Sequence, residues 1–394
     1  MHFIPNNNGL FVMVVGFRCG AINEPKELAG ISHVLEHVMF KNTTTKRSMH
    51  LIHTLKRLGA KWNATTHNDY TVYYVCSSIE NAQEVTQTLI DVVGALDVSD
   101  SEFQKGKFVV MEELALHPSE PAFRNVFKLA HLGTPYSSSI IGSKKTIEAM
   151  SLGDVKQFHE AHYKRPIIIY SCGTKYKTRV EEWLSDYNIN NVQPPCNRLV
   201  DINVGRILGR DNRILTKTSA GQSESCQLAY LGFPMSDPRA QIANLIAYIL
   251  SHRMFLEVRE QNSLVYSIKI EHDTRAHVGC FIVRFKTRRG QVVNVLRAFK
   301  RHVADLAKMD HRTYRSFYSS WTKARLVNSK VNPFYTALNA VERELYCADA
   351  NANTKIIRDP TLLTTLFDPS RLGYIIRTKT GSRKEIDKIL KIVE

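Results

Sequence analysis

The segment 31–40, with the sequence ISHVLEHVMF, carries three side chains whose types and spacing suit catalysis: His33, Glu36 and His37. Helical residues three and four positions apart share a face, so the two imidazoles can converge on one point with Glu36 beside them. The remaining positions are mostly apolar, which predicts a buried helix. Burying two imidazoles and a carboxylate without a partner is costly, and a bound cation removes that cost. We therefore expect a metal site on this helix.

The order His-x-x-Glu-His is the inverted form of the commoner His-Glu-x-x-His zinc motif and defines the inverzincins. Catalytic zinc usually has three protein ligands, so a third must come from elsewhere in the chain. Glu113 is a candidate, because it shares a helical stripe with the apolar residues Val109, Val110 and Leu116, where an unpaired carboxylate is unexpected. Glu112 points about 100° away on the same helix and is equally able to be the solvated member of the pair.

These motifs resemble the pitrilysin family of zinc peptidases, which includes insulin-degrading enzyme and the mitochondrial processing peptidase. In that family the His-x-x-Glu-His helix is combined with a distant glutamate, and Glu113 follows His37 by the family's spacing (113 − 37 = 76 residues). The resemblance implies one Zn²⁺ per chain, held by His33, His37 and Glu113, with Glu36 as general base. It further implies a zinc-dependent endopeptidase that hydrolyses extended or unfolded peptides.

The stretch 59–74 resembles the family pattern G-A-x-x-N-A-x-T-x-x-D-x-T-x-Y. The resemblance implies that the strand bearing Asn63, Ala64 and Thr65 borders the metal and binds substrate. An extended peptide added to a sheet edge fits this role, because its main chain is bound whatever its side chains are. A plain hairpin with a polar turn is the alternative.

Residues 255–267, FLEVREQNSLVYS, resemble the family segment F-x-x-V-R-E-x-x-x-L-x-Y. The resemblance implies that Arg259 and Tyr266 contact substrate opposite the zinc. A guanidinium can hold a substrate carbonyl or carboxylate, and a phenol can donate to an oxyanion. The alternative is a helix-end arginine and a core tyrosine. A chain of this length corresponds to half of the family's closed chamber, so we expect a homodimer, or a heterodimer with a related chain, in which this pair reaches the partner's zinc.

The sequence departs from the family at two places. The glycine-rich turn before segment 255–267 is replaced by IAYILSHRM, and a supporting glutamate seven residues before Glu113 is replaced by Gly106. The second departure favours an alternative function, a non-catalytic or partner-dependent subunit of a processing-peptidase-like complex. The complete ligand set and Glu36 favour the peptidase.

Composition narrows the protein's class. With 43% apolar and 23% charged residues the chain is typical of a globular protein. No apolar run is long enough for a membrane span, and the amino end has no pattern of a secretory signal. The net charge of +16 is compatible with an acidic substrate or a nucleic-acid partner, but the dispersed basic residues favour a solvated surface and no nucleic acid. Seven scattered cysteines without a C-x-x-C predict thiols in a reducing compartment, with the cytoplasm favoured and an organelle matrix or viral particle left open.

The pattern of elements predicts an α+β fold of two related domains, each an antiparallel-rich sheet with helices on one face. We expect a zinc-binding domain at 1–192, a linker at 193–212 and a homologous domain at 213–394. The clearest strand is 10–21, and 123–132, 238–250 and 254–261 are expected to be separate helices. Compared with the family the amino end is short, which leaves open whether an edge strand precedes residue 10.

Overall fold

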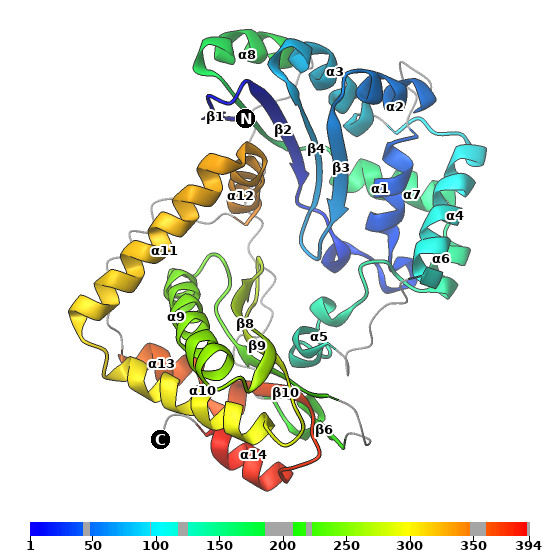
Figure 1. The fold of residues 1–394 in the computed structure, drawn as a ribbon. Helices are drawn as coiled ribbons and strands as arrows, with labels where there is room; N and C mark the ends of the chain where they lie inside the picture. The colour runs from blue at the N-terminus through cyan, green and yellow to red at the C-terminus, as the bar shows by residue number, and fades with distance from the viewer. Residues whose placement is uncertain are drawn as a thin grey trace. The chain divides into compact units, whose positions relative to one another are not determined.

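The computed structural model describes residues 1–41, 48–94, 96–116, 125–185, 208–217, 223–346 and 360–391 (Figure 1). The chain forms two compact units, each made from three segments. Unit 1 contains 1–119, 138–197 and 326–347, and unit 2 contains 120–137, 198–325 and 348–394. Compared with domains divided near residue 200, two segments lie in the other unit. Segment 120–137 belongs to unit 2, and segment 326–347 belongs to unit 1. The predicted linker, 193–212, lies outside the described residues as far as position 207.

The core of unit 1 is a five-stranded sheet in the order β1-β5-β2-β4-β3. Its strands are β1 (His2–Pro5), β2 (Leu10–Phe17), β3 (Lys61–Thr66), β4 (Thr71–Ser78) and β5 (Ile167–Cys172). The predicted strand 10–21 is shorter than expected and ends at Phe17. An edge strand, β1, does precede residue 10, a point that the sequence left open. It pairs in parallel with β5, whereas the other pairs are antiparallel. β3 forms the opposite edge.

Helices cover both faces of this sheet. Phe11, Met13 and Val15 alternate along β2 toward an apolar core formed with one group of helices. This group contains α1 (Ile31–Met39), α3 (Ala82–Val93), α4 (Asp100–Leu116), α7 (Leu152–His162) and α8 (Lys177–Ser185), with α2 (Ser48–Arg57) and α6 (Lys144–Ala149) beside it. On the other face lies α12 (Pro333–Leu345), which packs against β2 and β5.

The close approach of α12 depends on a glycine. A Cβ on Gly16 would lie 2.6 Å from Val341 and 3.0 Å from Leu345, so the strand has no room for a side chain there. The expectation of helices on one face only is therefore wrong for unit 1. The covering helix comes from the far end of the chain, and no local pattern in 10–17 indicates it.

Unit 2 repeats the same topology. Its sheet has the order β6-β10-β7-β9-β8, which is the order of unit 1 with each strand number raised by five. The strands are β6 (Arg213–Thr216), β7 (Glu224–Leu231), β8 (Val265–Thr274), β9 (Gly279–Thr287) and β10 (Leu372–Arg377). As in unit 1, the first strand is parallel to the last and the other pairs are antiparallel. The expectation of two related αβ domains is confirmed.

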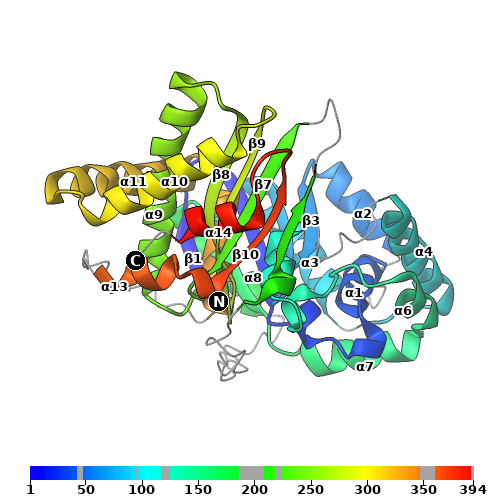
Figure 2. The ribbon, with the colours of Figure 1, turned by 90° about the horizontal axis from the view of Figure 1, so that it is seen from below.

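One face of the second sheet packs on a helical core. Within this core α9 (Arg239–Met254), α10 (Val292–Ala307) and α14 (Arg383–Leu390) bury their apolar sides, and α10 contacts α14 over the sheet (Figure 2). The short α5 (Val126–Ala130) packs on β10, β7 and β9. It occupies the place that α12 has in unit 1, against the equivalent strands. Each unit thus receives one helix from a distant part of the chain.

The other elements differ in detail from the sequence expectations. The two helices expected at 238–250 and 254–261 are one continuous element, because α9 passes directly into a π-helical turn at Phe255–Gln261. The helix expected at 123–132 is confined, among described residues, to Val126–Ala130. The remaining helices are α11 (His311–Val331) and α13 (Pro360–Leu366). No described helix combines the length and apolarity that a membrane crossing requires. The five described cysteines are free thiols: Cys19, Cys76, Cys172, Cys226 and Cys280.

Candidate metal centre

Helix α1 is held at its amino end by a buried carboxylate. Glu24 accepts hydrogen bonds from the backbone N–H of Gly30 at 2.7 Å and of Ser32 at 2.9 Å, one on each oxygen. These are donors that a helix leaves unsatisfied in its first turn. Gly30 has φ +97°, a left-handed conformation that favours glycine. Glu24 therefore fixes where α1 begins and how it presents the residues that follow.

His33, His37 and Glu113 converge on one point in unit 1. The Nε2 atom of His33 lies 3.6 Å from one carboxylate oxygen of Glu113, and Nε2 of His37 lies 3.5 Å from the other. One ligand atom from each residue lies within 4.8 Å of the other two. The two histidines come from α1 and the glutamate from α4, and these helices pack directly on each other. This is the one group of three His, Cys, Asp or Glu ligands found among the described residues.

Each imidazole lies at a distance from the Glu113 carboxylate that is compatible with a shared zinc ion. Zinc binds histidine nitrogen and carboxylate oxygen at about 2.0–2.2 Å, so two of its ligand atoms in a tetrahedral site lie roughly 3.3–3.6 Å apart. The observed distances of 3.5 and 3.6 Å are of this size and exceed a normal N–H···O hydrogen bond. The donor set, two imidazoles and one carboxylate, is also one that catalytic zinc uses.

Burial keeps the histidines in the form that binds metal. Desolvation lowers the pKa of His33 to about 4, with a smaller effect from neighbouring His37. Desolvation also lowers the pKa of His37, although the charge of Glu113 opposes the shift. Both rings are therefore neutral near pH 7 and have a lone pair for a cation. The buried Nδ1 atom of His33 has no hydrogen-bond partner among the described residues, so the part of the chain that is described orients its ring by packing.

Glu36 lies on the same helix but has a different environment. Its side chain accepts a 2.6 Å hydrogen bond from the hydroxyl of Thr66, and the residue is only 9% exposed. Burial raises the pKa of Glu36 to about 7, the Thr66 hydrogen bond opposes this rise, and the charge of Glu113 adds to it. A carboxylate with such a pKa can take up and release a proton near neutral pH.

The two glutamates of α4 are now distinguished. Glu112 is exposed, whereas Glu113 is partly buried and directed at the imidazoles. Gly106, one of the sequence departures, is buried where α4 meets α1. A Cβ there would lie 3.0 Å from Val38, tighter than an ordinary contact. The helices are close enough at this point that a glutamate could enter only if α1 or Val38 moved.

The predicted substrate strand borders the site. β3 contains Asn63, Ala64 and Thr65, and it packs against α1. Ala64 is buried, Asn63 is exposed and Thr65 is half-buried. β3 pairs with β4 on one side only, and no described strand pairs with its outer edge. The next residue, Thr66, is the partner of Glu36. Sequence reasoning assigned Thr66 no role, although it occupies the threonine of the pattern quoted for 59–74.

Arg259 and Tyr266 belong to unit 2. Arg259 lies in the π-helical turn, with its guanidinium 5.2 Å from the ring centre of Phe255 and a 3.9 Å contact to Glu260. Tyr266 is on β8 and is 60% exposed, so it is not the core tyrosine of the alternative interpretation. Both side chains have surface available for a ligand, and their predicted role stays a prediction.

Comparison with known proteins identifies the family of the chain. Residues 10–144 match the family model "Insulinase (Peptidase family M16)", and residues 149–311 match "Peptidase M16 inactive domain". The uncharacterized zinc protease YmxG of Bacillus subtilis is 24% identical over 306 residues, 73% of this chain and 71% of the relative. The beta subunit of the mitochondrial-processing peptidase of Rattus norvegicus is 26% identical over 171 residues, which cover 42% of this chain and 35% of that one.

Solved structures show the same fold. The first half of the periplasmic protease PqqL from Escherichia coli superposes with a TM-score of 0.77 at 15% identity, over 99% of this chain and 93% of that one. A protease from Helicobacter pylori gives 0.71 at 16% identity, over 95% and 96%. The two matched stretches reach into both units, and the first contains His33, Glu36, His37 and Glu113. The chain belongs to the M16, insulinase-like or pitrilysin, family of zinc peptidases.

Proposed function

We propose that this protein is a zinc-dependent endopeptidase that cleaves extended or unfolded peptides. The observation that carries the proposal is the convergence of His33, His37 and Glu113, whose ligand atoms lie within 4.8 Å of one another, with Glu36 on the same helix. These three residues would hold one zinc ion per chain. When bound, zinc supplies Lewis acidity at the scissile carbonyl and lowers the pKa of water.

The chain's own groups would then handle the proton and the substrate. Glu36, with its pKa raised to about 7, takes a proton from the attacking water and returns it to the leaving amine. Thr66 holds the Glu36 carboxylate in place through its hydroxyl. The free edge of β3 would bind an extended substrate through main-chain hydrogen bonds. This mode of binding depends little on substrate side chains, in line with a broad range of peptides.

The general-base role is tested with Glu36→Gln. This change keeps the size of the side chain but removes its ability to accept a proton, and it leaves the three ligands intact. We expect one zinc per chain, as in the wild type, and loss of peptide cleavage by a factor of about 10² or more. Cleavage of a peptide mixture is followed by mass spectrometry, with a chelator control. Unchanged turnover would refute the assignment.

The ligand assignment is tested with a pair of neighbouring variants. Glu113→Gln removes the carboxylate that faces the imidazoles, and Glu112→Gln makes the same change one residue earlier on the exposed side of α4. We expect Glu113→Gln to lose bound zinc and activity and Glu112→Gln to keep both, as measured by elemental analysis and peptide turnover. Equal zinc contents in the two variants would contradict the proposed ligand set.

A non-catalytic or partner-dependent subunit is the second candidate. Gly106 favours it, because a buried glycine replaces a carboxylate near the centre, and so does the match of 149–311 to an inactive-domain model. A solved chain of complex III2 from Candida albicans has the same fold, with a TM-score of 0.72 at 12% identity. A protein that binds one zinc but cleaves nothing, alone or as a dimer, would support this function over the peptidase.

A further inference from the structure

The second face of the unit 2 sheet carries a basic groove that the proposed catalysis does not use. Side chains alternate along each strand, so the residues facing the helical core and those facing away are separable. Cys226, Phe285 and Ile376 belong to the helical core. Their neighbours one position away in sequence face the opposite side. There α5 covers one part of the sheet, and a groove of about 750 Å³ occupies another.

The floor of the groove is built from residues that the strand register places side by side. One row across β10, β7, β9 and β8 contains Arg377, Ser225, Lys286 and Ser267. The adjacent row contains Ile375, Gln227, Arg284 and Lys269. All of them except Lys269 line the groove. Its volume is within the range of known ligand sites.

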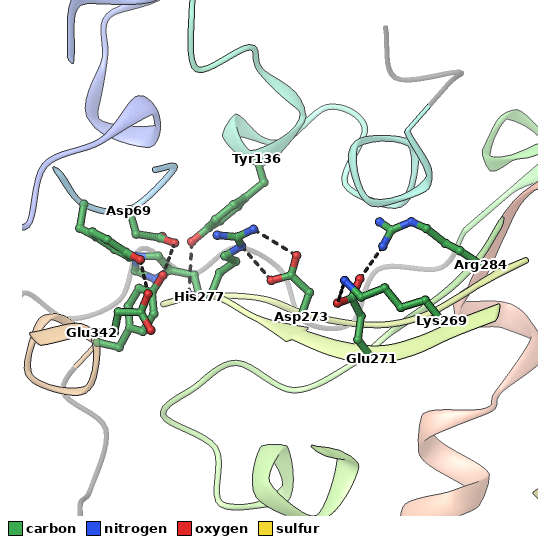
Figure 3. Close-up of polar contacts among 11 residues, drawn as sticks. Asp69, Tyr136, Lys269, Glu271, Asp273, His277, Arg284 and Glu342 are labelled. Carbon is green, nitrogen blue, oxygen red and sulfur yellow. Dashed lines mark hydrogen bonds and ion pairs between the residues drawn. The ribbon is translucent and has the colours of Figure 1, made fainter. Parts of the chain in front are cut away.

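The charges on this face do not balance. Glu271, on β8, forms ion pairs with Lys269 and Arg284, as Figure 3 shows. This single negative charge neutralises only one of the two positive charges that it contacts. Lys286 and Arg377 are exposed, and among the described residues neither side chain has a partner for an ion pair or hydrogen bond. Gathering like charges on one sheet face is unfavourable, so an anionic ligand would stabilise the groove.

The spacing of the cations indicates the shape of the ligand. Arg284 and Lys286 are two residues apart on one strand, which is about 6.6–6.8 Å. Arg377 is two strands away from Lys286, which is roughly 9–10 Å. A phosphate group or short polyphosphate is bound best by cations that converge on one point. The interval between Arg284 and Lys286 equals that between alternate residues of an extended peptide, so both can pair with carboxylates on one side of such a peptide, and Arg377 can contact it from across the groove.

We propose that the groove formed by Ser225, Gln227, Ser267, Arg284, Lys286 and Arg377 binds an acidic stretch of an extended peptide. The polar floor residues would hydrogen-bond the peptide, and the guanidinium groups and Lys286 would pair with its carboxylates. As a substrate-selecting site the groove rests on the proposed peptidase function. It would make peptides with an acidic segment better substrates than neutral ones, through a lower KM at unchanged kcat.

Binding is measured without cleavage, on the full-length protein in the presence of a chelator. The probe is a labelled ten-residue peptide with alternating Glu and Ser, and its matched control has Gln in place of every Glu. By fluorescence anisotropy we expect the Glu peptide to bind at least tenfold more tightly than the Gln peptide, with the difference shrinking as salt is raised. Equal affinities for the two peptides would overturn the proposal.

The site is located with matched charge reversals. Lys286→Glu with Arg377→Glu should weaken binding of the Glu peptide at least tenfold. Lys308→Glu with Arg312→Glu, which makes the same change of net charge at exposed positions outside the groove, should weaken it less than twofold. All four residues are exposed, and thermal unfolding verifies that both variants are folded. Equal losses in both double variants would contradict the groove.

Further outcomes distinguish a peptide ligand from a phosphate ligand, and the groove proposal from the peptidase function. If inorganic tripolyphosphate binds one site tightly while the Glu peptide does not bind, the groove is a phosphate site and the peptide proposal is wrong. If the Glu peptide binds in the groove but no peptide is ever cleaved with zinc present, the groove stands and the peptidase function fails. If peptides are cleaved without preference for acidic ones and the Glu peptide does not bind in the groove, the peptidase function stands and the groove proposal fails.

Discussion

At the scale of single residues the metal centre depends on burial. The same desolvation acts in opposite directions on two kinds of group, because it always disfavours the charged form. It lowers the pKa of His33 to about 4, which leaves a neutral ligand, and it raises the pKa of Glu36 to about 7, which makes a base near neutral pH. One buried helix, α1, therefore carries both functions.

The hydroxyl of Thr66 sets the ionisation of Glu36. Its hydrogen bond stabilises the carboxylate form, so Thr66→Val, which keeps the shape but removes the donor, should raise the pKa of Glu36 further. A general base acts when ionised. The acidic limb of the pH profile of kcat/KM should therefore move to higher pH, by about one unit, with less activity at pH 7. Thr65→Val, one residue earlier on β3, has its side chain on the opposite face of the strand and should leave the acidic limb in place, whatever its effect on KM. An unmoved acidic limb in Thr66→Val would contradict this role.

At the scale of elements the centre is a contact between two helices and a strand. α1 supplies the histidines and Glu36, α4 supplies Glu113 and β3 supplies Thr66. Their relative positions depend on close packing, as the 3.0 Å approach of a Gly106 Cβ to Val38 shows. A shift of α1 along its axis would move both histidines away from Glu113 together.

Glu24 opposes such a shift through its hydrogen bonds at the amino end of α1. Glu24→Gln keeps one acceptor oxygen but directs an NH₂ group at one of the two backbone N–H donors of Gly30 and Ser32. We expect unfolding free energy to fall by about 1–2 kcal/mol and zinc affinity to fall as well. Glu27→Gln, at an exposed position nearby, should change neither. Thermal unfolding with and without zinc measures both effects, and a Glu24→Gln protein with wild-type stability would disprove the capping role.

At the scale of the whole molecule each unit is completed by a helix from elsewhere in the chain. α12 packs on the first sheet and α5 on the second, against equivalent strands. Their buried side chains tie segments that are far apart in sequence into one core. In unit 1 two hydrogen bonds add to this packing at the carboxyl end of α12. Tyr346 donates to Asp69 at 3.4 Å, and Arg18 donates to the carbonyl of Glu344 at 2.6 Å. Asp69 belongs to the same pattern, 59–74, that contains the substrate strand.

The proposed dimer is tested by mixing two inactive proteins. If Arg259 and Tyr266 act at the zinc of a partner chain, Glu36→Gln and Arg259→Ala chains together form mixed dimers with one intact site. After equal mixing and exchange, roughly a quarter of wild-type turnover should return, because half of the dimers are mixed and each has one of two sites. A mixture of Glu36→Gln with Glu113→Gln, both changed at the metal centre, should recover nothing. No recovery in the first mixture would contradict sharing between chains.

The sequence by itself determined the parts of the protein that are encoded locally. A nine-residue helix shows its histidines and glutamate by spacing alone, and the apolar run of β2 is equally local. The distant ligand could be narrowed to Glu112 or Glu113. The apolar stripe that favoured Glu113 is buried only at Val110, because Val109 and Leu116 are exposed. The duplication followed from element order, since related sheets require related sequences of strands.

Only the tertiary structure decided which distant residues complete these elements. It showed that Thr66 hydrogen-bonds Glu36, that Glu24 caps α1, and that α5 and α12 cover the sheets from afar. It also placed Lys286 and Arg377 on one face, with Ser225 between them. Periodicity reports which side of its own helix or strand a residue occupies, but the neighbour across a strand pair or a helix contact is set by packing of the whole chain. That information is not local, so no single stretch of sequence contains it.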